Sequence, residues 1–188
     1  MIPYTVERRA DTGVTNVTLG MWLFIASEVM LFGALFSAYA LLRVSAPEWP
    51  SGRDVLSLTL GSANTVVLIL GTSVIWRARA AALSTARRQL LISSVLMVGF
   101  LALKAFEYSD EIGRGLVPST STFLAMYFTL TGFHAAHVAA GLVANLWAWT
   151  GAARVSEAMT AGRLRSLALY WLFVDVVWLV IFGLMYVA

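Results

Sequence analysis

The chain has 188 residues, of which 60% are hydrophobic and only 12% are charged, a composition too apolar for an ordinary water-soluble domain. The net charge of +3 is modest and gives no indication of nucleic-acid binding. Because the chain has no cysteine, disulfides, thiolate metal sites and thiol nucleophiles are excluded. The composition predicts an integral membrane protein.

Five long apolar stretches follow one another along the chain, and each is long enough to cross about 30 Å of hydrocarbon as a helix. The pattern predicts an all-α, polytopic bundle of five transmembrane helices. We expect one membrane domain over residues 1–188, with spans at approximately 17–43, 55–76, 88–109, 120–150 and 166–187.

Two of these stretches are unusual in length. The first runs from near Val17 to Leu42, beyond the apolar region of a cleavable signal peptide, so we expect an uncleaved anchor. The fourth is overlong, since no Asp, Glu, Lys or Arg occurs between Gly115 and Ala153, and we expect it to tilt or to project from the membrane. It also carries small residues at every fourth position over 132–148, a ridge that lets another helix approach closely.

Arginines are distributed unequally between the two ends of the predicted bundle. Nine lie on the side of the N-terminus and three on the opposite side, so the positive-inside rule predicts a cytoplasmic N-terminus and a C-terminus outside. Five tryptophans should then lie near the cytoplasmic interface as aromatic anchors: Trp22, Trp76, Trp147, Trp149 and Trp171. The nine arginines are 8, 9, 77, 79, 87, 88, 154, 163 and 165; the three are 43, 53 and 114.

Six ionisable side chains lie within or at the edge of the apolar spans, where a charge is costly and usually marks a function or a structural partner. At about 1.5 Å of rise per residue, four of them lie near mid-depth and could meet at one level. The other two lie nearer the outer surface. The four are Glu28, His134, His137 and Asp175, and the outer two are Lys104 and Glu107.

Each mid-depth group has a structural and a functional interpretation. A carboxyl at Glu28 without a partner should be protonated, because desolvation disfavours the charge, and it could be either a neutral helix-to-helix hydrogen bond or a proton-exchanging group. Asp175, between aromatic residues, is expected to be a helix-to-helix strut. His134 and His137 share a helical face, but metal sites need three or four ligands. We interpret them as interior histidines bonded to Glu28, Asp175 or a carbonyl.

Lys104 and Glu107 are three residues apart on the third span, and they can pair with each other or extend to the outer interface. The stretch from Glu107 to Glu111 is expected to be a solvated helix end. No catalytic, cofactor-binding or metal-binding residue is predicted in this chain.

Four segments, in order across nearly the whole chain, resemble subunit III of the haem-copper respiratory oxidases (cytochrome c and quinol oxidases), in its short five-helix bacterial form. Two differences from the longer family members are visible: these have seven helices, of which this chain begins at the third, and Leu172 stands where they carry a histidine. The segments are Leu19–Phe32 with Ser27-Glu28-Val29, Lys104–Tyr108, Thr131–Val138 with both histidines, and Tyr170–Trp178 with Asp175.

The resemblance implies a non-catalytic subunit, in the bacterial inner membrane with a periplasmic C-terminus, packed beside the subunit I that holds the haems and copper. It implies contacts with other oxidase subunits, bound phospholipid, no cofactor in this chain, and support of proton uptake and stability during oxygen reduction. The electron donor is not predicted, because donor sites lie on other subunits.

Three other functions are compatible with the residues. The first is an accessory subunit of a nitric oxide reductase system, and the second is an autonomous small proton-linked transporter that uses Glu28. The third is a metal- or haem-binding membrane enzyme, which the shortage of ligands disfavours.

Overall fold

The computed structural model describes residues 9–151 and 157–188, and within them the chain is helical, without strands. The predicted all-α bundle is confirmed, since the described part contains five helices long and apolar enough to cross a membrane. The elements are α1 (Asn16–Ser45), α2 (Gly52–Val55), α3 (Leu58–Ala78), α4 (Leu83–Gly113), α5 (Thr122–Gly151), α6 (Glu157–Phe182) and the terminal π-helical turn η1 (Gly183–Val187).

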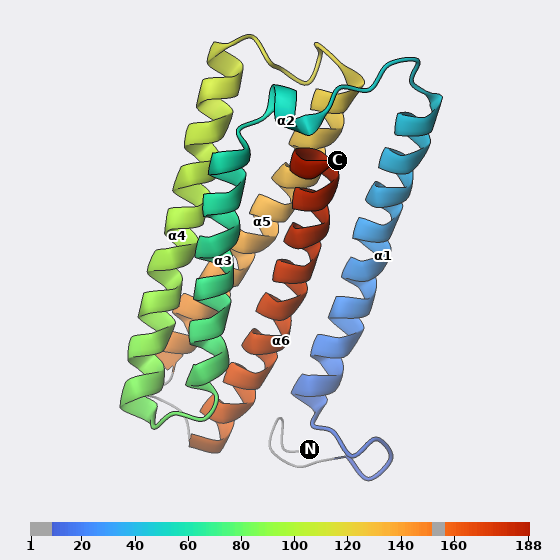
Figure 1. The fold of residues 1–188 in the computed structure, drawn as a ribbon. Coiled ribbons are helices and arrows are strands. Elements are labelled where there is room, and N and C mark those ends of the chain that lie inside the picture. Colours follow the sequence, from blue (N-terminus) through green and yellow to red (C-terminus); the bar gives the residue numbers. More distant parts are fainter. Residues whose placement is uncertain (1–8, 152–156) are drawn as a thin grey trace.

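The long helices run alternately up and down, so α1 begins at one end of the bundle and η1 lies toward the other (Figure 1). Helix α1 stands at the edge, and its buried side chains are Ile25, Phe32 and Tyr39. These lie seven residues apart, which is close to two helical turns, so they form one narrow stripe. Helix α1 therefore joins the bundle along a single seam, and most of its surface is left for lipid or another protein.

Helix α6 carries the largest buried side chains of the core. Trp171 and Trp178 are both fully buried. The indole N–H of Trp171 donates to Asn145 Oδ1 at 3.0 Å, and that of Trp178 donates to Thr65 Oγ1 at 2.9 Å. The prediction that Trp171 anchors the chain at the interface is therefore wrong. Its indole satisfies its N–H inside the bundle, which a fully buried tryptophan requires.

Helices α5 and α6 are in tight contact at Gly141. A Cβ added there would lie 2.6 Å from Trp171 Cζ2 and 2.7 Å from Tyr170 Cε1, so only glycine fits. On the small-residue ridge predicted for this helix, Ala136 and Ala140 are exposed. Ala144 and Ala148, at the other end of the ridge, pack against the core, so the ridge faces the bundle only in part.

The outer loop between α1 and α3 is fixed against the C-terminal turn. A Cβ at Gly52 would lie 1.7 Å from the carbonyl oxygen of Met185, so α2 can pack there only because residue 52 has no side chain. Tyr39 on α1 donates its hydroxyl proton to the carbonyl oxygen of Leu184 at 3.0 Å. These contacts tie α1, α2 and η1 together at one end of the bundle.

Candidate functional site

The ionisable side chains inside the bundle gather mainly in three separate places. The first is a buried cluster, called the outer cluster after the predicted topology, which is formed by Lys104, Glu107, Glu111, Tyr127 and Tyr186 at the end of the bundle that holds the C-terminal turn. The second is a pair between α1 and α5, and the third is a pair between α3 and α6. All six residues singled out in the sequence belong to these places or lie next to them.

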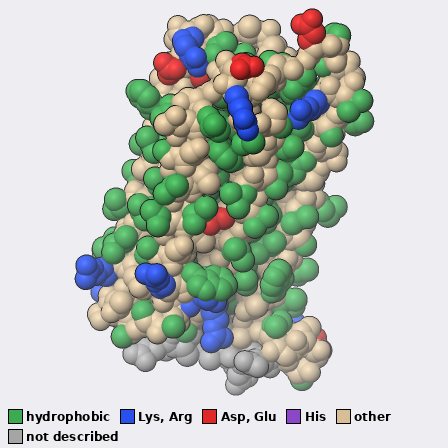
Figure 2. All heavy atoms as spheres, viewed as in Figure 1, with side chains coloured by type: hydrophobic (Ala, Val, Ile, Leu, Met, Phe, Trp, Pro, Cys, Tyr) green, Lys and Arg blue, Asp and Glu red, His purple; other side chains and the backbone are tan. Residues whose placement is uncertain are grey.

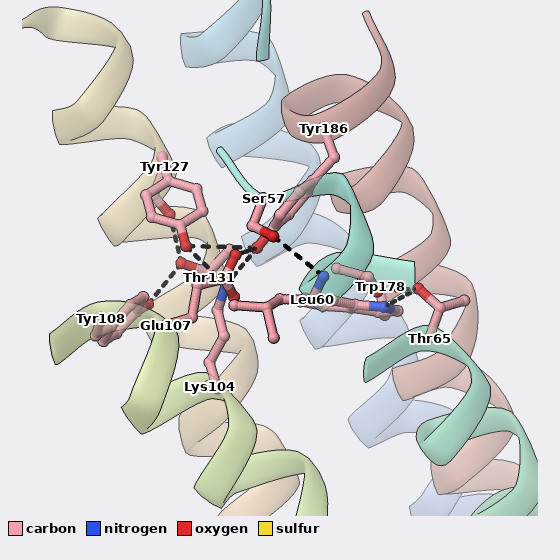
Figure 3. Close-up of polar contacts among 11 residues, drawn as sticks. Ser57, Leu60, Thr65, Lys104, Glu107, Tyr108, Tyr127, Thr131, Trp178 and Tyr186 are labelled. Atoms are coloured by element: carbon pink, nitrogen blue, oxygen red, sulfur yellow. Dashed lines mark hydrogen bonds and ion pairs between the residues drawn. The ribbon is translucent and has the colours of Figure 1, made fainter. Parts of the chain in front are cut away.

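Lys104 is the centre of the outer cluster (Figure 3). Its ammonium donates to Glu107 Oε2 at 2.9 Å. It also donates to the hydroxyl oxygens of Tyr127 at 2.9 Å and Tyr186 at 2.5 Å. Tyr186 in turn donates to Glu107 Oε1 at 2.8 Å. The three protons of the ammonium thus have three acceptors, which is what a lysine only 2% exposed needs.

Aromatic rings surround this ion pair and exclude water from it. The ammonium lies 4.6 Å from the ring centre of Tyr127 and 5.5 Å from that of Trp178, within cation–π range. Thr131 Oγ1 donates its proton to the Tyr127 carbonyl at 2.6 Å. The Tyr108 hydroxyl lies 2.5 Å from Thr131 Oγ1. Because the Thr131 proton is already used, Tyr108 must be the donor to Thr131 Oγ1. The hydrogen bonds of Lys104, Glu107, Tyr127 and Tyr186 thus brace α4 and α5 against η1 at the end of α6.

The prediction of a solvated end for helix α4 is wrong for Glu107 and Glu111, which are each 1% exposed. Residues 104, 107 and 111 are spaced three and four apart, so they share the face that packs against α5 and α6. Asp110 lies beside this face and is exposed, and it pairs there with Arg114 at 3.2 Å.

Glu28 and His137 form the pair between α1 and α5. Glu28 Oε2 lies 2.9 Å from His137 Nε2, and each side chain is 15% exposed. The other ring nitrogen, Nδ1, lies 2.7 Å from the carbonyl oxygen of Phe133. A carbonyl can only accept, so Nδ1 carries a proton. The contact between Oε2 and Nε2 then needs one proton, held either by the carboxyl or by the imidazole.

His134 points into the core instead. It is fully buried, and its Nε2 donates to the carbonyl oxygen of Val174 at 3.2 Å. Its ring packs against those of Phe100 and Trp178, with centres 5.6 and 5.0 Å away. A separation of three residues turns the helix by about 300°, so the two histidines diverge by about 60°. His134 therefore faces α6 and His137 faces α1.

Asp175 lies between α6 and α3, where its Oδ1 accepts a proton from Thr72 Oγ1 at 3.0 Å. Among the four mid-depth groups, hydrogen bonds join Glu28 to His137, whereas His134 and Asp175 have partners elsewhere. Within residues 9–151 and 157–188, no group of three or more His, Cys, Asp or Glu side chains is placed to hold a metal ion.

The comparison with known protein families matches residues 8–188 to cytochrome c oxidase subunit III. The chain belongs to the subunit III family of the haem-copper oxidases. Its relatives include subunit 3 of the cytochrome bo(3) ubiquinol oxidase of Pseudomonas aeruginosa, 31% identical and aligned over 91% of this chain and 84% of that protein. Subunit 3 of the cytochrome c oxidase of Bacillus sp. strain PS3 is 33% identical, and the alignment covers 98% of this chain and 91% of that protein.

A third relative of this chain is named as a combination of subunits I and III. The haem-copper oxidase subunit I+III of Aeropyrum pernix is 32% identical to this chain, over 91% of the chain and 22% of that protein. The resemblance seen in the four sequence segments is thus confirmed at the level of the family. Together with the five apolar helices, it makes the chain a multi-pass membrane protein.

Proposed function

We propose that this chain is subunit III of a haem-copper terminal oxidase of a bacterial inner membrane, packed directly on subunit I. The observation that carries the proposal is the relative named subunit I+III, because one chain that holds both subunits keeps them close together in the membrane. Haem and copper would then belong to subunit I. The relatives described above are oxidase subunits, which favours this assignment over a nitric oxide reductase accessory role or an autonomous transporter.

The polar groups would serve two purposes within such a complex. The outer cluster around Lys104 and the bond between Asp175 and Thr72 brace the helices. The pair of Glu28 and His137 is different, because it shares one proton and is not fully sealed from its surroundings. It is suited to hold a proton near the edge helix α1 and so to support proton supply to the catalytic subunit.

Replacement of Glu28 by glutamine tests the proton role. The amide keeps the shape and can still donate to His137 Nε2, but it cannot exchange a proton. We expect intact assembly and a modest slowing of oxygen reduction, greatest at high pH where protons are scarce. Turnover of the complex should be measured against pH, with Glu48→Gln on the exposed outer loop as the control. A Glu28→Gln profile that overlays the wild-type one would remove the proton role and leave only a helix brace.

We further propose that the N-terminus is cytoplasmic and the C-terminus periplasmic. The support is the nine-to-three arginine bias, together with the start of α1 and the η1 turn toward opposite ends of the bundle (Figure 1). Reporter fusions at each end should show activity of a cytoplasmic reporter only at the N-terminus, and of a periplasmic reporter only at the C-terminus. The reverse pattern would mean that the bundle is inserted the other way round.

A further inference from the structure

A groove of about 530 Å³ lies between α3 and α6, and the side chain of Asp175 lines it. Figure 2 shows acidic surface at mid-height over these helices, with hydrophobic side chains around it. The walls are otherwise apolar or weakly polar, with Trp76 and Arg77 at the end nearest the loop to α4. The lining residues are Ile69, Thr72, Ser73, Trp76, Arg77, Leu172 and Asp175.

The carboxyl of Asp175 is only half satisfied by this chain. Its Oδ1 accepts from Thr72, and the described residues provide no hydrogen bond to Oδ2. At mid-membrane depth a carboxyl oxygen needs a partner whether it is charged or protonated, because hydrocarbon offers none. The other mid-depth carboxyl, Glu28, already has His137. Of these two carboxyls, Asp175 is therefore the one with an oxygen left for a partner outside this chain.

The volume of the groove and the unpartnered Oδ2 of Asp175 together indicate what kind of molecule occupies the groove. A lipid acyl chain could fill the groove, but it would leave Oδ2 without a hydrogen bond. A lipid headgroup could bind Arg77, but residue 77 lies about 7.5 Å along α3 from Thr72, at 1.5 Å per residue. A side chain on a neighbouring transmembrane helix can both fill the space and donate to the carboxyl.

We propose that the groove between α3 and α6 is where this chain receives a transmembrane helix of the haem-bearing subunit. That helix carries a hydrogen-bond donor opposite Asp175, from a neutral polar or a cationic side chain. The inference rests on the proposed function and deepens it by naming the contact face. Leu172, Trp76 and Ile69, between 41% and 45% exposed, supply the apolar contacts around the polar one.

A photo-crosslinking amino acid at position 172 tests the contact in the native membrane, with wild-type Asp175 and with Asp175→Leu. We expect a crosslink to the haem-bearing subunit. Loss of one interhelical hydrogen bond should lower its yield about three- to tenfold in Asp175→Leu. Asp175→Asn, which can still accept and donate hydrogen bonds, should keep most of the yield.

Thr72→Val is the matched control, because it removes the internal hydrogen bond and leaves the carboxyl in place. Its crosslink yield should stay near the wild-type value; a loss as large as that of Asp175→Leu would overturn the inference. Crosslinks to lipid alone, in a complex that still contains the haem-bearing subunit, would also overturn the inference. The proposed function would survive that result. Absence of any haem-bearing subunit from the purified complex would overturn both.

Discussion

Replacement of Lys104 by methionine should cost about 3–5 kcal/mol of unfolding free energy, because it leaves Glu107 buried without its counter-charge. Methionine can occupy much of the space of the lysine stem, so the loss would come mainly from the charge and its hydrogen bonds. Both partners are only 2% exposed, and water cannot replace the ammonium without opening the contacts with Tyr127 and Tyr186. Thermal or denaturant unfolding of the purified protein in mild detergent measures the effect.

Two variants make this test specific. The double change Lys104→Met with Glu107→Leu should recover much of the lost stability, because it removes both charges together. Arg114→Ala breaks the exposed pair with Asp110, whose side chains are about half exposed, and should cost less than about 1 kcal/mol. If Lys104→Met were as mild as Arg114→Ala, the outer cluster would not be a brace.

Replacement of Gly141 by alanine should destabilise the bundle by about 1–3 kcal/mol through overpacking. The added Cβ would lie 2.6 Å from the Trp171 ring, which is fully buried and hydrogen-bonded to Asn145. Tyr170 is equally constrained, since its hydroxyl donates to the His137 carbonyl at 2.6 Å. Helix α5 would have to move away from α6, and this movement would displace His137.

Gly99→Ala on α4 is the control for this change. A Cβ there would meet its nearest atom, Val67 Cγ1, at 3.9 Å, which is an ordinary contact. Alanine is also a better helix former than glycine by up to about 1 kcal/mol, so this variant should be neutral or stabilising. The two glycines should thus respond with opposite signs in the same unfolding assay. An equally mild response at Gly141 would contradict the packing of α5 on α6.

Much of the fold could be predicted from the sequence because hydrophobicity and length determine which segments cross a membrane. Five apolar stretches became five long helices. The rotation of each helix about its axis could not be predicted, because a helix apolar all round gives no inward face. This explains the wrong prediction for Trp171, which lies within the core. It also explains why a tight contact with α6 falls at Gly141, beside the predicted ridge, while Ala136 and Ala140 on the ridge are exposed.

The candidate site was predictable as a set of residues but not as a set of contacts. An ionisable group in an apolar span is visible in the sequence, and all six groups found there have the hydrogen bonds described above. Their tyrosine and threonine partners could not be found, because single hydroxyls are common in membrane helices. Tyr127 and Tyr186, for example, are separated by 59 residues and meet only after α5 packs on the C-terminal turn. The spacing of Glu111 from Lys104 and Glu107 places it on the same buried face of α4. This spacing was overlooked because the adjacent Asp110 makes the stretch look like a solvated helix end.

The most direct test of the central claim is purification through an affinity tag on this chain, from its own membrane in mild detergent. We expect a large subunit that carries haem and copper to co-purify in equal amount, with an oxidase absorption spectrum. We also expect the chain dissociated from that subunit to contribute no haem absorption. Recovery of the intact chain without a haem-bearing partner, or a haem signal lost on substitution of His134 or His137, would contradict it.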